Sequence, residues 1–341
     1  MKQPEAPETP ARPAVPRRTF LASAAAATAG FTIVPRHVLG GQGVTAPSDK
    51  LNIAGIGIGG MGKNNILRCE SETIAALCDV DFGLAEPVFA RYKDAKRYKD
   101  FRVMLDEMPG IDAVVIATPD HSHAVIAMAC MERKKHVYVQ KPLTHSVYEA
   151  RLLTETARKH GVVTQMGNQG HSGEGARLLC EWVADDAIGK IHEAHAWTNR
   201  PVWPSGVEVD RPKEAPEPPP GLDWDLWLGP AAHRPFHPTY HPAKWRAWWD
   251  FGTGSLGDMG CHIVDPLFWA LKLKYPVAVE ASHSQYWQAF FERTVPKNEM
   301  FPRSTIVRFR FPAREKMPAV DVTWWDGGLM PPRPADLEPG R

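Results

Sequence analysis

Two side chains in the second half of the sequence have the types and the spacing of an acid–base pair. Asp258 and His262 stand four residues apart in the apolar stretch 254–271, which predicts a helix that carries both on one face. An imidazole titrates near neutral pH, so His262 is a candidate general base and Asp258 a candidate to orient it. Each residue alone also fits ordinary structure, because a helical histidine can be held by hydrogen bonds and an aspartate can cap a helix.

A glycine-rich turn in the first half has the pattern of a phosphate-binding loop. The apolar segment 51–56 predicts a buried strand, and a helix-compatible stretch follows at 63–69. The pattern G-x-G-x-x-G fits from Gly57, our preferred register, or from Gly55, and such a turn lets the backbone approach a pyrophosphate at a helix N-terminus. A second predicted strand, 73–78, ends at Asp79, where a carboxylate would hydrogen-bond an adenosine ribose.

These features predict an NAD site, and the acid disfavours the 2′-phosphate of NADP. The residues predicted to line it are Gly57, Gly59, Gly60, Met61, Gly62 and Asp79, with Asp81 as a second candidate for the ribose contact. The alternative is a glycine-rich strand-to-helix turn that binds no ligand.

The segments that follow predict the sheet that must position this site. Strands are expected at 112–117, 136–140 and 162–166, and helices at 121–133 and 146–160. Strands that alternate with helices are typical of a parallel, doubly wound sheet, in which ligands bind at the carboxyl ends of the strands. The loops at two of those ends carry Thr118, Pro119, His123, Gln140 and Lys141, which we expect beside the cofactor, with His123 in a structural role.

The order of these motifs resembles the Gfo/Idh/MocA family of NAD(P)-dependent sugar and cyclitol oxidoreductases. The resemblance rests on the glycine loop, Asp79, DAVVIATPDHSH at 112–123, KHVYVQKPL at 135–143 and EAR at 149–151, and it covers roughly residues 50–325. It implies a Rossmann domain followed by an α/β domain whose open, mainly antiparallel sheet carries the substrate site and often an oligomer interface. The expected divisions are a signal segment at 1–46, an NAD-binding domain at 47–167 and a substrate and oligomerisation domain at 168–341. Family members usually run further, so the second sheet is expected to be incomplete.

The resemblance also implies a catalytic set. Asp258 and His262 match the family's Asp-x-x-x-His pair, and Lys141 matches its catalytic lysine, although Gln140 replaces the usual glutamate before it. Oxidation of a secondary alcohol needs a base for the hydroxyl proton, a role that suits His262. Lys141 would hydrogen-bond the same oxygen and lower the pKa of the alcohol, and Asp258 would orient the other two.

The second half of the sequence predicts a different architecture. Strand-like segments lie at 190–199, 276–286, 304–311 and 319–325, and the loop 201–220 contains seven prolines, as a lid, an interface arm or a disordered segment would. All 12 tryptophans follow residue 180. Their flat faces suit sugar rings, but tryptophans are also ordinary core anchors. The substrate candidates are Asn168, His171, Lys244, Trp245 and Arg246. The histidines show no compact ligand spacing, so no metal is predicted.

The N-terminus has the pattern of an export signal. Arg17 and Arg18 precede Phe20-Leu21 and an uncharged apolar stretch at 22–34, which resembles a twin-arginine (Tat) signal with cleavage near residues 44–46; a frayed basic tail is the alternative. Residues 1–46 hold five basic and two acidic residues, so the rest of the chain carries a formal charge of −2, which argues against nucleic-acid binding. The five cysteines are odd in number and scattered, and suggest neither a disulfide framework nor a zinc site.

The sequence therefore predicts an exported, periplasmic or secreted NAD-dependent oxidoreductase of sugars, sugar acids or cyclitols, carried by the Tat machinery and forming a homo-oligomer. Because soluble NAD does not circulate outside the cytoplasm, its nicotinamide cofactor is expected to be tightly bound. One alternative is an NAD-dependent glycoside hydrolase that acts by transient oxidation. Another is an NAD-containing sugar-binding protein without turnover.

Overall fold

The computed structural model describes residues 45–202, 211–285, 287–290, 292–293, 299–334, 336–338 and 340. Residues 1–44 of the predicted export signal and residues 203–210 of the proline-rich loop lie outside the described residues. The chain divides into two compact units, Met1–Lys50 and Leu51–Arg341, and the described part of the first contains only the short helix η1 (Pro47–Asp49). Within the described residues, every helix is too short or too polar to cross a membrane.

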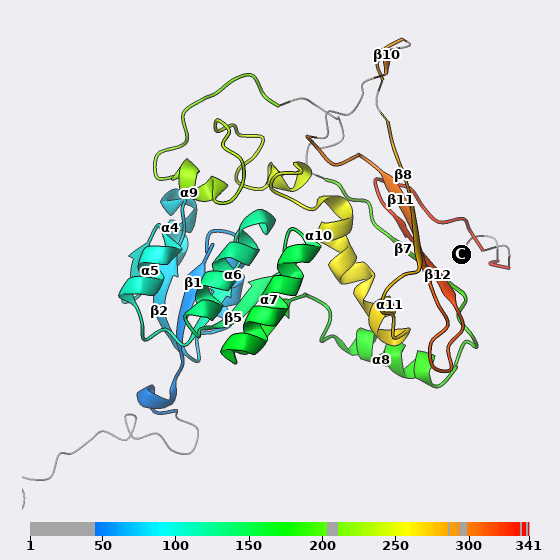
Figure 1. Cartoon of the computed structure of the whole chain (residues 1–341), viewed down its shortest axis with the longest axis horizontal. Coiled ribbons are helices and arrows are strands. Elements are labelled where there is room, and N and C mark those ends of the chain that lie inside the picture. Colours follow the sequence, from blue (N-terminus) through cyan, green and yellow to red (C-terminus); the bar gives the residue numbers. More distant parts are fainter. Residues whose placement is uncertain are drawn as a thin grey trace, which may run out of the picture. The chain divides into compact units, whose positions relative to one another are not determined.

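The first half of the second unit forms a six-stranded parallel sheet in the order β3-β2-β1-β4-β5-β6 (Figure 1). Its strands are β1 (Asn52–Ile56), β2 (Thr73–Cys78), β3 (Lys96–Tyr98), β4 (Ala113–Ile116), β5 (His136–Gln140) and β6 (Thr164–Gly167). This is the doubly wound arrangement predicted from the alternating pattern. The sequence did not predict β3, because its three residues, Lys-Arg-Tyr, show no apolar alternation.

Helices cover both faces of this sheet, because successive strand residues point to opposite sides. Ala54 and Val114 belong to one apolar core, whereas Ile53 and Val115, one residue away on the same strands, belong to another. The first core packs against α5 (Phe101–Glu107), α6 (His123–Glu132) and α7 (Val147–His160). The second packs against α3 (Met61–Leu67) and α4 (Phe82–Arg91).

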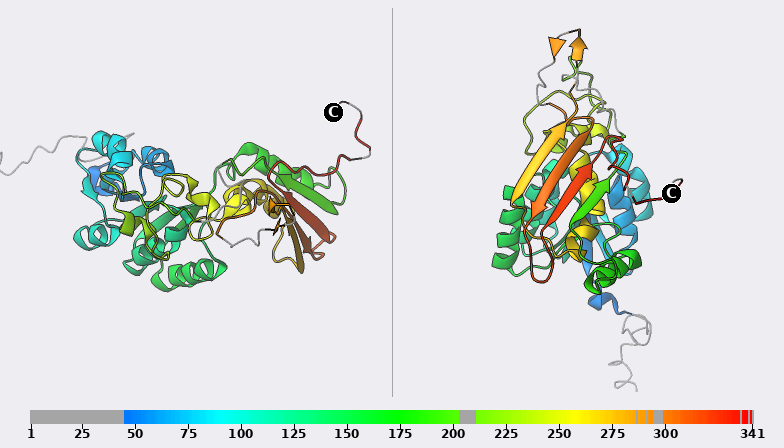
Figure 2. Two further views of the ribbon diagram at one scale, coloured as in Figure 1. Left: turned by 90° about the horizontal axis from the view of Figure 1, so that it is seen from above. Right: turned by 90° about the vertical axis from the view of Figure 1, so that its right-hand side faces the viewer.

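The second sheet has the order β7-β12-β11-β8, and two of its three pairings are antiparallel. Its strands are β7 (Glu193–Trp197), β8 (Ala278–His283), β11 (Thr305–Phe311) and β12 (Val320–Trp325), with a separate small hairpin, β9 (Trp287–Ala289) and β10 (Glu292–Arg293). One face packs on α8 (Glu174–Ala184), α10 (Gly254–Ile263) and α11 (Asp265–Ala270). In the right panel of Figure 2 the four strands lie in front of these helices, and no helix of the described part covers the face turned to the viewer.

The single helix predicted at 254–271 is wrong, because the structure has two, α10 and α11. Pro266 lies in the first turn of α11 and has no amide hydrogen to continue the helical bonding pattern, so the chain breaks at Val264.

The segment between the two sheets has little regular structure but a dense aromatic core. It contains α9 (Trp224–Leu228) and the 3₁₀ turn η3 (Lys244–Ala247). The rings of Trp224 and Trp227 stack with centroids 4.6 Å apart, and the buried Arg234 lies over the rings of Tyr240 and Phe251. Trp224, Trp227, Trp245 and Trp248 are buried in this core.

Candidate active site

A cleft of ≈ 420 Å³ opens at the carboxyl ends of β1, β2, β4 and β5, where a doubly wound sheet binds its ligands. Many of the predicted cofactor residues line it: Gly57, Gly59, Gly60, Met61, Asp79, Thr118, Pro119, Gln140 and Lys141. Trp245 and Arg246, two of the predicted substrate residues, line it as well. Gly62, His123, Asn168, His171, Lys244, Asp258 and His262 do not belong to its lining.

The glycine loop is shaped by close backbone contacts. Gly57 has φ +77°, a left-handed conformation that favours glycine, and a Cβ added there would lie 2.7 Å from the backbone nitrogen of Thr118. A Cβ on Gly62 would collide with the carbonyl group of Gly57. These two glycines therefore let the start of α3 pack directly onto the turn, while Gly59, Gly60 and Met61 face the cleft.

The carboxylate of Asp79 joins the glycine loop to the end of β2. Its Oδ2 accepts a hydrogen bond from the Gly59 amide at 2.9 Å, and its Oδ1 accepts one from the Asp81 amide at 3.0 Å. Burial raises the pKa of the Asp79 carboxyl above its usual range, and these backbone hydrogen bonds oppose that effect. Each oxygen keeps a second lone pair that can accept a hydroxyl group of a ribose in the cleft.

Asp81, the second candidate for the ribose contact, has a different set of partners. Its Oδ1 accepts from the Leu84 amide at 3.0 Å and caps α4, and its Oδ2 lies 2.8 Å from Nε2 of His241. Asp81 is not part of the cleft lining, so the geometry favours Asp79 as the ribose ligand.

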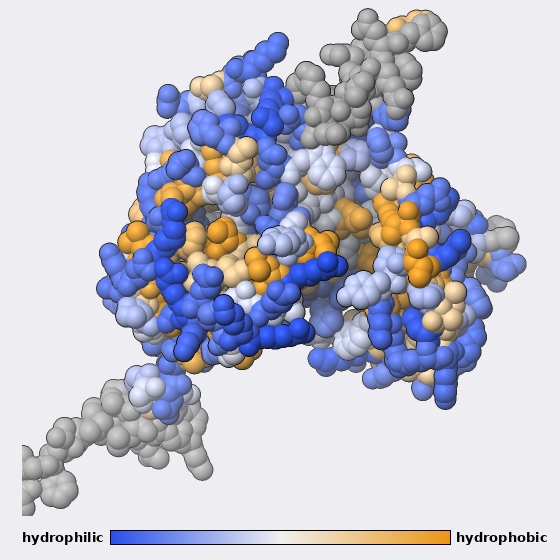
Figure 3. All heavy atoms as spheres, in the orientation of Figure 1, coloured by the Kyte–Doolittle hydropathy of each residue, from blue (hydrophilic) through white to orange (hydrophobic). Residues whose placement is uncertain are grey.

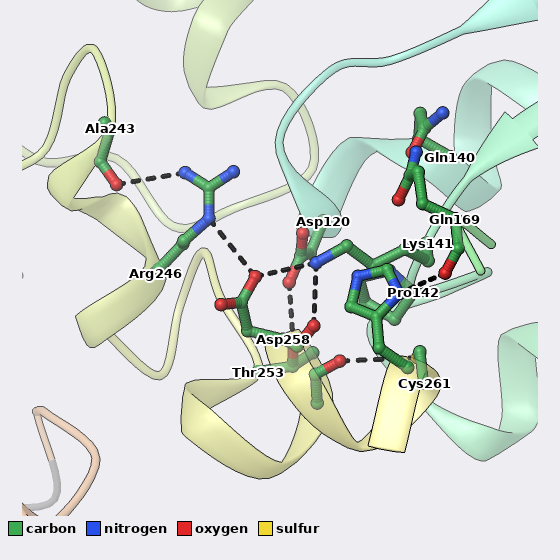
Figure 4. A network of polar contacts seen from close by, with 12 residues as sticks. Asp120, Gln140, Lys141, Pro142, Gln169, Ala243, Arg246, Thr253, Asp258 and Cys261 are labelled. Carbon is green, nitrogen blue, oxygen red and sulfur yellow. Dashed lines mark hydrogen bonds and ion pairs between the residues drawn. The ribbon is translucent and has the colours of Figure 1, made fainter. Parts of the chain in front are cut away.

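Lys141 connects the cleft to helix α10. Its Nζ donates to Oδ1 of Asp258 at 2.8 Å and to the Asp258 carbonyl oxygen at 2.7 Å, and only 14% and 11% of the two side chains are exposed (Figure 4). Nε of Arg246 lies 3.6 Å from the same Oδ1, and the guanidinium group rests on the ring of Trp245. The structure thus brings together Lys141 and Asp258, which the sequence predicted as catalytic, with Arg246, which it predicted as a substrate residue.

His262 is one helical turn beyond Asp258, and its Nδ1 lies 3.0 Å from the carbonyl oxygen of Gln169. Because a carbonyl oxygen only accepts, this contact favours the neutral tautomer with hydrogen on Nδ1. Nε2 then keeps its lone pair, as a proton acceptor requires.

The two predicted substrate residues that follow β6 pack against the helices of the second half. Nδ2 of Asn168 donates to the Cys261 carbonyl oxygen at 2.5 Å. Nδ1 of His171 lies 2.7 Å from Oδ2 of Asp265, and its ring stacks on Trp269. These contacts fix the loop after β6 beside α10 and α11.

His123 and Gln140 have bridging roles. The buried His123 ring lies between the carbonyl oxygens of Pro142, 2.7 Å from Nδ1, and Thr118, 2.8 Å from Nε2, so it ties together the loops after β4 and β5. Nε2 of Gln140 donates to Oδ1 of Asn65 in α3 at 3.0 Å.

The sequence placed the loop that contains Asp120 beside the cofactor but did not select Asp120 itself, which lines the cleft and is only 5% exposed. Its Oδ2 accepts a hydrogen bond from Oγ1 of Thr253 at 2.7 Å, just before α10. Burial raises the pKa of Asp120 to about 6, against the opposing effects of the Thr253 hydrogen bond and the cations Arg246 and Lys141. An aspartate after Pro119 is typical of a loop, and only its position at the end of a central strand could have indicated a functional residue.

The cysteines and the potential metal ligands form no further centre in the described part of the chain. All five cysteines are free thiols. No three side chains of the His, Cys, Asp or Glu type in that part gather as a bound metal ion would require.

Comparison with known proteins identifies two family domains. Residues 51–168 match the oxidoreductase family with an NAD-binding Rossmann fold (GFO_IDH_MocA), and residues 189–291 match the C-terminal alpha/beta domain of the same family. The chain is 25% identical to the myo-inositol 2-dehydrogenase of Thermotoga maritima over 156 residues, 46% of each protein. It is 24% identical to the levoglucosan dehydrogenase of Pseudarthrobacter phenanthrenivorans over 227 residues, 63% of this chain and 50% of that protein.

These matches span half or less of the length of each curated relative. Among solved structures, GenD2 from gentamicin A biosynthesis, in complex with NAD, resembles the chain with a TM-score of 0.58 at 22% identity. That likeness covers 89% of this chain and 70% of GenD2, and it supports the fold. The chain therefore contains both domains of the Gfo/Idh/MocA oxidoreductase family, the NAD-binding Rossmann domain and the C-terminal α/β domain.

Proposed function

We propose that the chain is an NAD-dependent oxidoreductase that oxidises a secondary alcohol of a small sugar, sugar acid or cyclitol. The observation that carries this proposal is the position of Lys141, which lines the cleft beside the glycine loop and also donates to Asp258 of α10. The names of the relatives, dehydrogenases of myo-inositol and levoglucosan, support the substrate class.

The residues of the cleft fit a dinucleotide. The backbone of Gly59, Gly60 and Met61 leaves room for a pyrophosphate, and Asp79 offers acceptors to the adenosine ribose. When bound there, NAD would supply a nicotinamide ring that accepts a hydride from the alcohol carbon.

Lys141, Asp258 and His262 would then remove the hydroxyl proton of the alcohol. Lys141 donates a hydrogen bond to the alcohol oxygen and stabilises the negative charge that develops on it, while Asp258 holds the ammonium group in place. Nε2 of His262 takes the hydroxyl proton, because its Nδ1 is engaged with Gln169.

Export, cofactor retention and assembly are further parts of the proposal. The pair Arg17-Arg18 with the apolar stretch 22–34 supports Tat-dependent export to the periplasm or beyond, and export favours a tightly bound cofactor. The outer face of the second sheet supports a homo-oligomer, because no helix of the described part covers it and Trp197 of β7, which follows the core residue Ala196 and so points to the outer face, is 46% exposed. Figure 3 views this sheet from its edge and shows apolar side chains among hydrophilic ones where Figure 1 draws β8 and β11. Light scattering after size exclusion would measure the oligomeric state.

The activity can be tested on the purified chain loaded with NAD. Myo-inositol, levoglucosan, glucose and glucuronate are added in turn, and absorbance at 340 nm reports NADH. We expect a rise with at least one alcohol, and a loss of that rise in Lys141→Met and His262→Gln while NAD stays bound. Lys190→Met is the matched control, because Lys190 also pairs with an aspartate, Asp186, but on the exposed surface.

Two results would contradict the proposal. Aryl glycosides that release their aglycone with no net change in the cofactor would indicate a hydrolase. A folded, NAD-loaded protein that acts on none of these compounds would indicate a binding protein.

A further inference from the structure

The wall of the cleft that faces the Rossmann loops comes from a segment far away in the sequence. We call residues 221–246 the strap. The strap residues that line the cleft are Leu226, Trp227, Gly229, Pro230, His241, Pro242, Ala243, Trp245 and Arg246. The sequence predicted only the last two of these as site residues. A ligand that fills the cleft therefore lies between the Rossmann loops and the strap.

Backbone hydrogen bonds attach the strap to the loop after β2. The Asp223 amide donates to the Val80 carbonyl oxygen at 2.9 Å, and the Phe82 amide donates to the Gly221 carbonyl oxygen at 3.3 Å. These bonds flank an antiparallel bridge between Asp81 and Leu222. The attachment point thus adjoins Asp79, the proposed ribose ligand.

A second attachment joins the strap to the loop after β4. Nε2 of the buried His121 lies 3.1 Å from the Trp227 carbonyl oxygen, and the His121 amide donates to the carbonyl oxygen of Phe251, just beyond the strap, at 3.2 Å. The strap is therefore held at the ends of β2 and β4, whose loops both border the cleft.

The strap also contributes one polar side chain to this region. Nε2 of His241 lies 2.8 Å from Oδ2 of Asp81, with 10% and 14% of the two side chains exposed. Nδ1 of His241 is buried and has no hydrogen-bond partner in the described part of the protein, although the residue lines the cleft. A buried polar atom without a partner is costly, so a ligand that offers a donor to Nδ1 gains from binding.

The aromatic core makes the strap rigid. Trp227 lines the cleft and stacks on Trp224, and its ring makes a T-shaped contact with the His241 ring, with centroids 5.8 Å apart. Arg234 pairs with Asp250 beneath the same cluster. Moving the strap away from the cleft would expose these rings to water, which is unfavourable.

We infer that the strap encloses the adenosine half of the dinucleotide and that His241 is one of its ligands. The hydrogen bond between His241 and Asp81 holds the strap in place, so the cofactor is retained between turnovers. This inference rests on the proposed NAD binding. It explains how an exported enzyme would keep its cofactor, and it assigns the retention to named contacts of the second half of the chain.

The experiment measures retention without turnover. The full chain is purified, dialysed and denatured, and the released NAD is counted per chain; bound NAD is then exchanged against isotopically labelled NAD. We expect wild-type protein to keep NAD through dialysis and to exchange it slowly. His241→Ala and Asp81→Asn should exchange it roughly tenfold to a hundredfold faster, as the loss of a charge-assisted hydrogen bond implies. Asn at position 81 keeps an oxygen for the Leu84 amide, so α4 stays capped.

His195→Ala is the matched control, because His195 also pairs with a carboxylate, Glu193 at 3.0 Å, but on β7, outside the cleft lining. It should exchange NAD at the wild-type rate. Wild-type protein that loses NAD on dialysis, or that exchanges it as fast as His241→Ala, overturns the inference even if the alcohol is oxidised. Retained NAD with no oxidised alcohol supports the inference and contradicts the proposed function instead. A chain that binds no NAD at all overturns both.

Discussion

The buried carboxyl of Asp120 should make the free energy of unfolding depend on pH by an amount that can be worked out. Its pKa is raised from 3.8 to about 6 in the folded chain, mainly by burial. Between these values the folded state holds a proton that the unfolded state has released, so stability falls as pH rises. The loss is complete above about pH 6. At about 1.4 kcal/mol per pKa unit, a difference of about two units corresponds to roughly 3 kcal/mol.

Asp120→Asn isolates this effect. The amide oxygen still accepts from Oγ1 of Thr253, but the side chain carries no charge, so the penalty at neutral pH disappears. We expect the variant and the wild type to differ little at pH 4. At pH 8 the variant should be more stable by about 3 kcal/mol. Urea unfolding followed by tryptophan fluorescence at the two pH values measures the difference.

The control is Asp94→Asn, which removes an exposed carboxyl from the loop between α4 and β3 and should leave the stability unchanged at both pH values. If Asp120→Asn is no more stable than the wild type at pH 8, the carboxyl is stabilised in the folded state by its cations, and our account of its burial is wrong. A gain in stability of the same size at pH 4 and pH 8 would also contradict this explanation.

Two other predictions test the local geometry of the Rossmann half. Gly57→Ala forces a Cβ to within 2.7 Å of the Thr118 nitrogen at a φ of +77°, so NAD affinity measured by calorimetry should fall by at least roughly tenfold, whereas Gly110→Ala, which has open space, should bind normally. Cys130, whose pKa burial raises to about 12, should resist alkylation by iodoacetamide at pH 8 in the native protein and react fully in urea; rapid labelling of the native thiol, seen by mass spectrometry, would contradict its burial.

The sequence predicted the framework of the Rossmann half well because its pattern is local. The bounds of β2 and β5 agree with the predicted segments, and Ser146 caps α7 with Glu149 in a capping box at the predicted start of that helix. The contact between Lys141 and Asp258 joins residues 117 positions apart, so it could be expected from the resemblance but not from any local pattern.

Other features depend on tertiary structure and left no periodic signal. The strap has one short helix and a loop rich in tryptophan and proline, and neither composition shows which surface it contacts. The pairing of His241 with Asp81 spans 160 positions, and the raised pKa of Asp120 arises from burial that only the folded chain creates.

In the proposed reaction, hydride passes from a carbinol carbon of the substrate to NAD held in the cleft. Perdeuterated myo-inositol and perdeuterated levoglucosan are incubated with the NAD-loaded chain. The reduced cofactor is then released, and its mass is measured by mass spectrometry. We expect NADH that carries deuterium from the wild type, and no labelled NADH from Lys141→Met loaded with NAD to the same extent. NAD that stays bound, oxidised and unlabelled with every alcohol tested would contradict it.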